Sequence, residues 1–227
     1  MSSLDTAARA PLRLDETVPV ALLLAFAGGY IDAYTWIMHG VMANAQTANL
    51  VFLWVYAMIG NWNKALHFVP PILAFAAGTV IAAWLRLVTG NRAGAISTLI
   101  EILLLVLIGV LHNRLPDLAG TFGISLVAAM QAAIFTRVEG EVYNSMMITG
   151  SMRQAIEGIF TVAIGGRPPG ALRRSGIFMA VCVAFGLGAA VGAFATKTIP
   201  HLTLGLPVFA LLLVLLRCAV EHKETHR

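Results

Sequence analysis

Long apolar stretches alternate with short polar breaks along most of the chain. A membrane-spanning α-helix needs about 20 consecutive apolar residues, and runs of that length predict helices rather than the short alternating strands of a β-barrel. We predict eight helical segments, of which the second is the shortest. Their approximate bounds are 18–38, 47–59, 66–88, 94–111, 118–135, 143–164, 175–196 and 202–220.

The order of long, short or polar, long and long segments occurs twice, which predicts two internal repeats. The first repeat covers about 18–112 and the second about 118–220. The third segment of each repeat carries small residues four positions apart, a spacing that lets helix backbones approach closely in lipid. Chance is the alternative, because membrane helices are rich in Gly and Ala. The two stripes are Phe75-Ala76-Ala77-Gly78 with Ala82, and Phe185-Gly186-Leu187-Gly188 with Gly192.

The composition agrees with this pattern. Hydrophobic residues make up 59% of the chain and charged residues only 11%, whereas soluble domains average about 25% charged residues. We therefore predict an all-α, polytopic membrane protein, with six full spans and two short or broken helices. Residues 18–220 would form one transmembrane domain, and residues 1–17 and 221–227 would be cytoplasmic tails.

Lys and Arg near the segment ends constrain the topology. If all eight segments span, Lys64 and Arg114 lie inside while Arg86 and Arg92 lie outside; if segments two and six are re-entrant, these sides are exchanged. Both arrangements put the two termini in the cytoplasm, and charge does not choose between them. The shortness of segment two and the polar N-terminal ends of both segments favour the re-entrant arrangement, in which the repeats are inverted.

A polar motif recurs in the apolar background of each half. Its most informative residue is Asp32, because placing an ionised carboxylate in a membrane costs about 3 kcal/mol of free energy on insertion scales. Asp32 is either a proton- or cation-coupled group or substrate contact, or an interfacial or capping residue. The first copy is Gly28-Gly29-Tyr30-Ile31-Asp32-Ala33 with Asn44-Ala45-Gln46-Thr47-Ala48-Asn49; the second is Ala128-Ala129-Met130-Gln131-Ala132 with Asn144-Ser145 and Thr149-Gly150-Ser151.

Small polar residues mark the starts of segments two and six: Thr47, Asn49, Thr149 and Ser151. The free N–H groups and positive dipole end of a helix start favour an anionic or polar ligand. Ordinary capping and interhelical hydrogen bonding are the alternative. Gln131 occupies the place of Asp32 in the second half, where it either meets Asp32 across the centre or packs as a buried polar residue.

Three further charged residues lie inside apolar segments. Arg153 and Glu157 are spaced i, i+4 and are expected to pair on one helix face, either as a structural pair or as lining of a site. Glu101 has no local partner, so it faces a cavity or is protonated. The sequence shows no metal-ligand spacing, nucleotide loop or nucleophile motif. We therefore expect no enzyme activity, cofactor, metal or nucleic-acid partner.

In these motifs the chain resembles the YoaK family of bacterial membrane proteins, which is also called domain of unknown function 1275. The resemblance runs from about residue 18 to 220. Ala48 stands where that family usually has glycine, and Ala132 where it usually has asparagine. If the family's glycine allows two backbones to approach closely, the methyl group of Ala48 narrows the space between them. Ala132 lacks the side-chain amide of the asparagine. The resemblance implies a location in the bacterial inner membrane, but the family has no settled activity. The matching stretches are Gly29-Tyr30-Ile31-Asp32-Ala33, Thr47-Ala48-Asn49, Gln131-Ala132-Ala133 and Thr149-Gly150.

Two functional hypotheses follow. The first is a small-solute transporter or permease in the lipid bilayer, with a polar site between the repeats for a small polar or anionic solute. In it, Arg153 is the candidate anion partner and Glu157 or Asp32 the proton-coupling carboxylate. The second is a non-transporting scaffold, assembly factor or sensor. Tight packing of the polar residues without a connecting cavity would support this second hypothesis. The proposed site comprises Asp32, Thr47, Asn49, Gln131, Thr149, Ser151, Arg153 and Glu157.

Overall fold

The structure is a computed structural model, and it describes residues 14–111, 114–145, 148–165, 170–199 and 203–224. The N-terminal tail up to residue 13 lies outside the described residues. The elements are η1 (Leu14–Glu16), α1 (Val18–His39), α2 (Gln46–Met58), α3 (Trp62–Leu66), α4 (Val69–Thr89), η2 (Gly90–Arg92), α5 (Ala93–Leu111), α6 (Asp117–Ile134), β1 (Arg137–Val138), β2 (Glu141–Val142), α7 (Ile148–Ala163), α8 (Ala171–Thr198) and α9 (Gly205–Glu224). The strands β1 and β2 form one short antiparallel pair.

By length and composition, four stretches of the described chain are long and apolar enough to cross a membrane. They are Val18–His39, Trp62–Leu111, Asp117–Ile134 and Ala171–Thr198, and a shorter apolar helix covers Gly205–Cys218. The second stretch contains both α4 and α5. The expected class, an all-α multi-pass membrane protein, is confirmed.

The helices follow the predicted segments with local differences. Segment six was expected from residue 143, but residues 143–145 are not helical, and the described part of α7 runs from Ile148. The last helix continues to Glu224, beyond its predicted end at residue 220. Proline opens both α1 and α4, where its missing N–H costs no intrahelical hydrogen bond.

Close helix pairs form around the small-residue stripes. On α8, a Cβ added to Gly188 would overlap the carbonyl oxygen of Phe26, and one on Gly192 would lie 2.7 Å from the oxygen of Tyr30. On α4, a Cβ on Gly78 would overlap the carbonyl oxygen of Leu126. The predicted role of both stripes in close backbone packing is confirmed.

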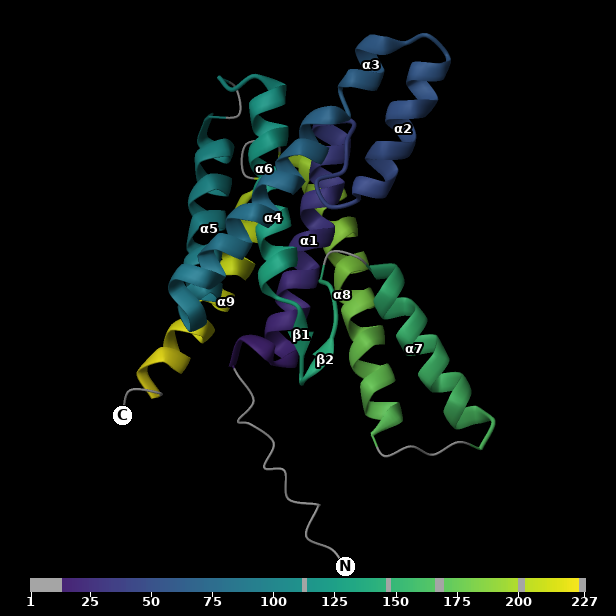
Figure 1. Cartoon of the computed structure of the whole chain (residues 1–227), viewed down its shortest axis with the longest axis vertical. Coiled ribbons are helices and arrows are strands. Elements are labelled where there is room, and N and C mark those ends of the chain that lie inside the picture. The colour runs from purple at the N-terminus through teal and green to yellow at the C-terminus, as the bar shows by residue number, and fades with distance from the viewer. Residues whose placement is uncertain (1–13, 112–113, 146–147, 166–169, 200–202, 225–227) are drawn as a thin grey trace, which may run out of the picture.

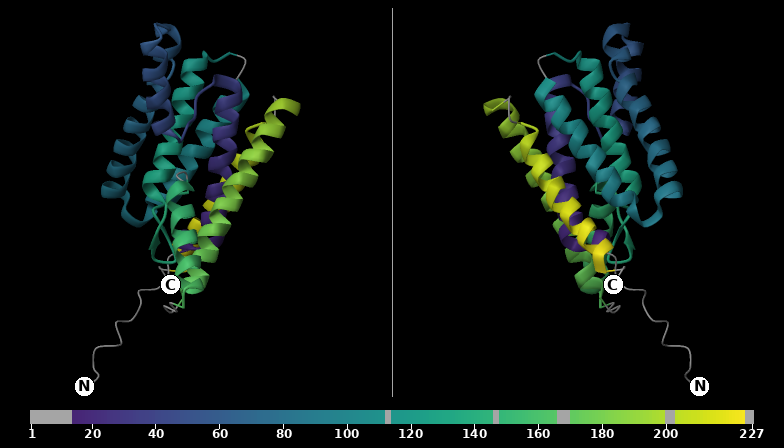
Figure 2. Two further views of the ribbon diagram at one scale, coloured as in Figure 1. Left: turned by 90° about the vertical axis from the view of Figure 1, so that its right-hand side faces the viewer. Right: turned by 90° about the vertical axis from the view of Figure 1, so that its left-hand side faces the viewer.

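These contacts also give helix directions. Residue numbers rise together along α8 and α1, so this pair is parallel. The α1 and α6 helices are antiparallel, since Gln131 bonds to Leu24 at one end and Gly120 lies near His39 at the other. Figure 1 shows the long helices side by side, with η1 and the lower end of α9 at the same end of the bundle. Figure 2 shows α8 and α9 inclined to the long axis of the bundle.

The helices α2 and α7, which are shorter than the long helices of the bundle, begin deep within it. Before α2, the Asn44 side chain donates to the carbonyl of Gly28 over 3.2 Å. Gly28 lies eleven residues before the end of α1, about 16 Å along the helix axis. At the start of α7, the Cys182 thiol lies 4.0 Å from the carbonyl oxygen of Ile148. Cys182 lies eleven residues after the start of α8, again about 16 Å.

Candidate functional site

Asp32 holds the loop that leads into α2. It lies on α1 and is 9% exposed. Its Oδ1 accepts the backbone N–H of Asn44 over 2.9 Å. One turn further along α1, the Thr35 hydroxyl accepts the backbone N–H of Ala43 over 3.2 Å. These bonds satisfy backbone groups that would otherwise be buried without partners, so Asp32 and Thr35 fasten the loop against α1.

Asn49 fastens the same loop from the other side. It lies in the first turn of α2 and is buried. Its Oδ1 accepts the Met42 N–H over 3.2 Å, and its Nδ2 donates to the Met42 carbonyl over 2.7 Å. Thr47, two residues earlier, has an exposed side chain. The first polar cluster therefore consists of Asp32, Thr35, Asn44 and Asn49 around the entrance to α2.

Gln131 performs the corresponding task in the second half. It is fully buried on α6. Its Nε2 donates to the Leu24 carbonyl over 3.1 Å and lies 3.2 Å from the Ser145 hydroxyl. At the start of α7, Thr149 is exposed. Ser151 is buried, and its hydroxyl has no hydrogen-bond partner among the described residues.

The structure places the predicted polar residues in two clusters, one for each half. Gln131 bonds to α1 at Leu24, eight residues from Asp32. Eight helical residues correspond to about 12 Å along the axis. The position of Asp32 on α1 and the point where Gln131 contacts α1 therefore lie at different depths in the bundle. Each of the two side chains holds the loop that precedes the short helix of its own half.

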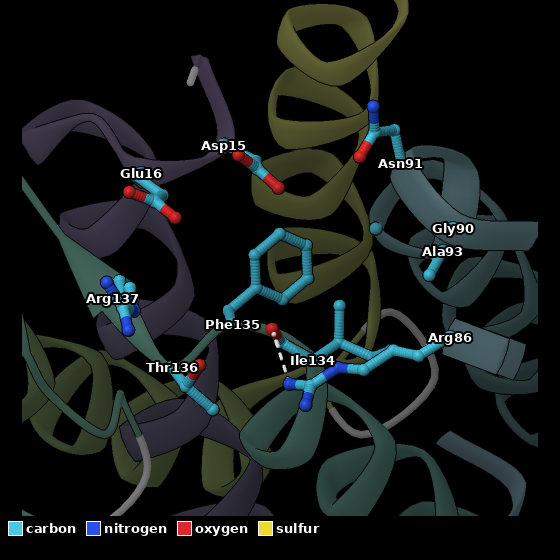
Figure 3. A pocket seen from close by; sticks show the side chains of 11 residues that line it. Asp15, Glu16, Arg86, Gly90, Asn91, Ala93, Ile134, Phe135, Thr136 and Arg137 are labelled. Carbon is cyan, nitrogen blue, oxygen red and sulfur yellow. Dashed lines mark hydrogen bonds between the residues drawn. The ribbon is translucent and has the colours of Figure 1, made fainter. Parts of the chain in front are cut away.

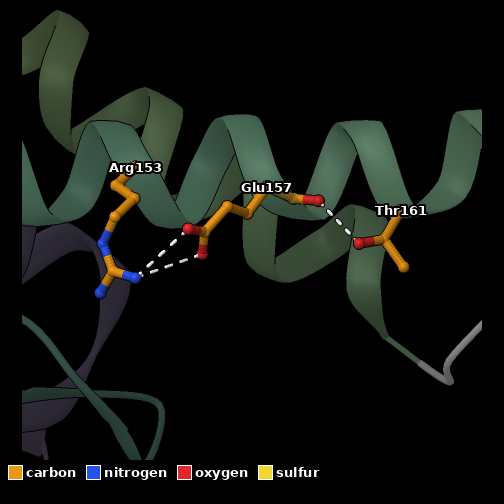
Figure 4. Close-up of polar contacts among 3 residues, drawn as sticks. All are labelled: Arg153, Glu157 and Thr161. Atoms are coloured by element: carbon orange, nitrogen blue, oxygen red, sulfur yellow. Dashed lines mark hydrogen bonds and ion pairs between the residues drawn. The ribbon is translucent and has the colours of Figure 1, made fainter.

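Arg153 and Glu157 form the expected i, i+4 ion pair on α7, with Arg153 Nη1 3.2 Å from Glu157 Oε1. Figure 4 shows this pair, together with the Thr161 hydroxyl that donates to the Glu157 carbonyl. The two charged side chains are 68% and 60% exposed. They stand on the outer face of α7 rather than among the buried polar residues.

A pocket of about 320 Å³ lies at the end of the bundle near η1. None of the eight predicted site residues lines it. Figure 3 shows Asp15 and Glu16 on one side, Phe135 between them and Arg86, and the Arg86 guanidinium donating to the end of α6. The acceptors are the carbonyls of Ala133 and Ile134, the latter at 3.0 Å.

Sequence reasoning missed this pocket because its walls come from η1, η2, the start of α5, the ends of α4 and α6, and the hairpin. The only sequence signal was the cluster of charges at segment ends, which we used for topology. The lining combines two acids, Asp15 and Glu16, with two cations, Arg86 and Arg137. This mixed-charge surface suits polar or zwitterionic groups and small hydrated ions rather than an apolar ligand.

The buried face of α5 carries a second polar feature. Ser97, Thr98 and Glu101 are all buried there, and Glu101 is only 1% exposed. The Thr98 hydroxyl donates to the Gly94 carbonyl over 2.9 Å. Both Glu101 carboxyl oxygens and the Ser97 hydroxyl have no hydrogen-bond partner among the described residues. Within that same part of the chain, no group of His, Cys, Asp and Glu could hold a metal ion.

One family model matches this chain, over residues 20–217, and its description is "Protein of unknown function (DUF1275)". The match covers both polar clusters, the α5 face and the pocket lining except Asp15 and Glu16. Comparison with curated proteins and with solved structures found no match.

Proposed function

We propose that this chain, which belongs to the DUF1275 family, is a permease for a small polar or anionic solute, built from two inverted repeats. The observation that carries the proposal is the pair of short helices that begin about halfway into the bundle. Thirteen residues of α2 and sixteen of α7 extend about 20 and 24 Å, less than the hydrocarbon thickness of about 30 Å.

Helix packing supports the repeat. Gly188 of α8 meets Phe26, and Gly78 of α4 meets Leu126. The parallel pair α1–α8 thus corresponds to α6–α4, and the two pairs run in opposite directions, as inverted repeats require. In this register Phe26 corresponds to Leu126, so Asp32 corresponds to Ala132 rather than to Gln131. The six long helices α1, α4, α5, α6, α8 and α9 would each span once.

Positive charge supports the orientation. The pocket brings Arg86 and Arg137 to the same end as η1. Lys64 lies in α3, at the opposite end of the bundle (Figure 1), and Arg114 follows the far end of α5. Arg92 of η2 lies at the end with Arg86 and Arg137, and so do Arg173 and Arg174, which pair with Glu139 and Glu141 of the hairpin. At the opposite end, only Lys197 in the last turn of α8 joins Lys64 and Arg114 among the described residues of these helix ends and connections. Because cytoplasmic loops carry an excess of Lys and Arg, the end with Arg86 and Arg137 is proposed as the cytoplasmic one, together with both termini.

In the proposed permease, α2 and α7 enter from opposite sides and point their N-termini toward the midplane. Broken helices in transporters present such positive ends to anionic groups of the substrate. Thr47, Thr149 and Ser151 are the contacts nearest these ends, and Ser151 offers a buried hydroxyl without a partner among the described residues. Arg153 is the candidate anion partner at the periphery, and Glu157 or Asp32 the candidate proton-coupling carboxylate. Asp32, Asn49 and Gln131 act mainly by holding the loops.

The test uses purified full-length protein and a panel of small inorganic anions and carboxylates. Thermal shifts select a binder, whose flux is then measured in proteoliposomes. Ser151→Ala should reduce the flux several-fold because it removes a polar contact at the helix start. Thr161→Ala, which alters an exposed hydroxyl on the same helix, should leave it unchanged. Absence of flux and of any ligand-induced shift across the panel would contradict the permease.

The alternative is a non-transporting scaffold, assembly factor or sensor. One observation favours it: Asp32, Asn49 and Gln131 bond to their own loops, and the pocket of Figure 3 lies elsewhere. Under this alternative the polar residues serve only to build the short helices. The protein would then give no flux with any solute, while Asp32→Ala would still lower its stability.

A further inference from the structure

We infer that Glu101 is a proton-binding site in the interior of the bundle, and that its proton exchanges with water through the pocket of Figure 3, at the end of the bundle that carries η1. This site is separate from the duplicated motifs. The inference concerns protonation alone and stands whether or not the protein transports a solute.

The surroundings of Glu101 require a neutral carboxyl group. The side chain is 1% exposed, and neither carboxyl oxygen has a hydrogen-bond partner within the described chain. Its neighbours on the buried face of α5, Ile102, Leu105 and Ile108, belong to the largest hydrophobic core cluster. An isolated carboxylate in such an apolar environment is so unfavourable that the group takes up a proton instead.

No described cation offsets this charge. α5 packs against α4, η2, α6 and α9. Arg86 is engaged with carbonyls at the end of α6, and Asp117 pairs with His39 at the opposite end of the bundle. None of the described groups on these helices hydrogen-bonds to the Glu101 carboxyl. The titratable residues of these four elements are Arg86, Arg92, Asp117, Arg217, Cys218 and, in the last turn of α9, Glu221, His222, Lys223 and Glu224.

A route from the pocket runs along one face of α5. Gly94 lines the pocket, Ser97 follows one turn later and Glu101 one turn after that, all on the buried face. Seven residues separate Gly94 from Glu101, about 10 Å along the axis. The Ser97 hydroxyl has no other partner among the described residues, whereas the Thr98 hydroxyl is occupied by the Gly94 carbonyl. Ser97 is therefore the relay between pocket and carboxyl.

The neighbouring helix α6 adds another buried hydroxyl near Glu101. Gly94 lies against Phe135 and Gly123 against Ile108, so α5 and α6 are antiparallel and Glu101 lies level with about residue 129. Ser125 is one turn away, about 6 Å along the axis. Its hydroxyl is buried and has no partner in the described part of the chain. A hydroxyl thus stands within about a turn of Glu101 on each of two packed helices, which suits proton relay and small bound waters.

Infrared spectroscopy of the full-length protein in lipid tests the inference. A protonated carboxylic acid gives a carbonyl band that an ionised carboxylate lacks. At neutral pH we expect a component of this band that Glu101→Gln removes and Asp32→Asn retains. If Glu101→Gln removes no such component, Glu101 is ionised and the inference is wrong. Should Glu101→Gln not fold, mass spectrometry of wild-type protein treated with dicyclohexylcarbodiimide, which modifies protonated buried carboxyls, must find the adduct on Glu101.

Transfer to D₂O tests the route. The Glu101 component should shift as deuterium replaces the proton, and Ser97→Ala should slow that shift several-fold. Thr98→Ala is the matched control, because its hydroxyl is already bonded to Gly94, and should leave the rate unchanged. A band that never shifts, or equal rates in the wild type and Ser97→Ala, would overturn the proposed route. None of these readouts needs a transported solute, so they fail independently of the permease proposal.

Discussion

At the scale of single residues, Asp32 acts on the chain entering α2. Asp32→Ala removes the acceptor for the Asn44 N–H and leaves a buried donor unpaired, which costs about 1–3 kcal/mol. We expect that loss in the free energy of unfolding, measured by denaturation in detergent micelles. Thr47→Ala, at an exposed position on the same loop-to-helix junction, should change it little. Equal effects of the two substitutions would show that the Asn44 contact does not stabilise the fold.

The Arg153–Glu157 pair tests whether the outer face of α7 meets lipid or water. The two side chains are 68% and 60% exposed on the surface of the chain, and a re-entrant α7 places them within the hydrocarbon thickness. Water-exposed i, i+4 pairs contribute about 0.3–0.5 kcal/mol, whereas a charged side chain left alone in the membrane costs about 2.5–3.5 kcal/mol. A double-mutant cycle with Arg153→Ala and Glu157→Ala in lipid should therefore give a coupling energy above about 1 kcal/mol. A coupling within the range of water-exposed pairs would show that this face of α7 meets water and would contradict a membrane-embedded α7.

The sequence identified Asp32 and Gln131 as buried polar residues because each stands alone in an apolar run. It did not identify their partners. The Asn44 backbone N–H and the Leu24 carbonyl become available only through the path of the loop and the crossing of α1 and α6. Glu101 was noticed for its missing local partner, but its relation to Ser97 and the pocket depends on helix packing.

At the scale of elements, close contact between α1 and α8 depends on glycine. A methyl group at Gly188 would overlap the carbonyl of Phe26, whereas Gly186, half a turn away, has open space around it. Gly188→Ala should therefore lower stability by about 1–3 kcal/mol, the usual cost of overpacking. Gly186→Ala should be neutral or slightly stabilising, since alanine favours the helix. Thermal unfolding in detergent compares the two; equal midpoints would contradict the packing described here.

Helix periodicity and length were enough to predict the long elements and their small-residue stripes. The β1–β2 hairpin was not predicted, because a two-residue strand pair is too short to leave a pattern. The pocket was not predicted at all, since Asp15, Arg86 and Phe135 lie far apart in sequence and meet only when three elements end at one level.

At the scale of the whole molecule, the central claim is that α2 and α7 are re-entrant from opposite sides. The deep contacts of Asn44 with Gly28 and of Cys182 with Ile148 support it. The claim determines the side of every connection. Re-entrance puts Asn61 and Arg114 outside and Asn91 and Arg137 inside, whereas eight full spans would put each of them on the other side.

Labelling of single cysteines tests this claim most directly. Asn61, Asn91, Arg114 and Arg137 are exposed and can each be replaced by Cys after Cys182 and Cys218 are changed to Ala. A membrane-impermeant maleimide is applied to intact cells and to permeabilised cells. The account predicts that Asn61→Cys and Arg114→Cys react in intact cells, while Asn91→Cys and Arg137→Cys react only after permeabilisation. The reverse pattern would show that all eight segments span, and would contradict the re-entrant account.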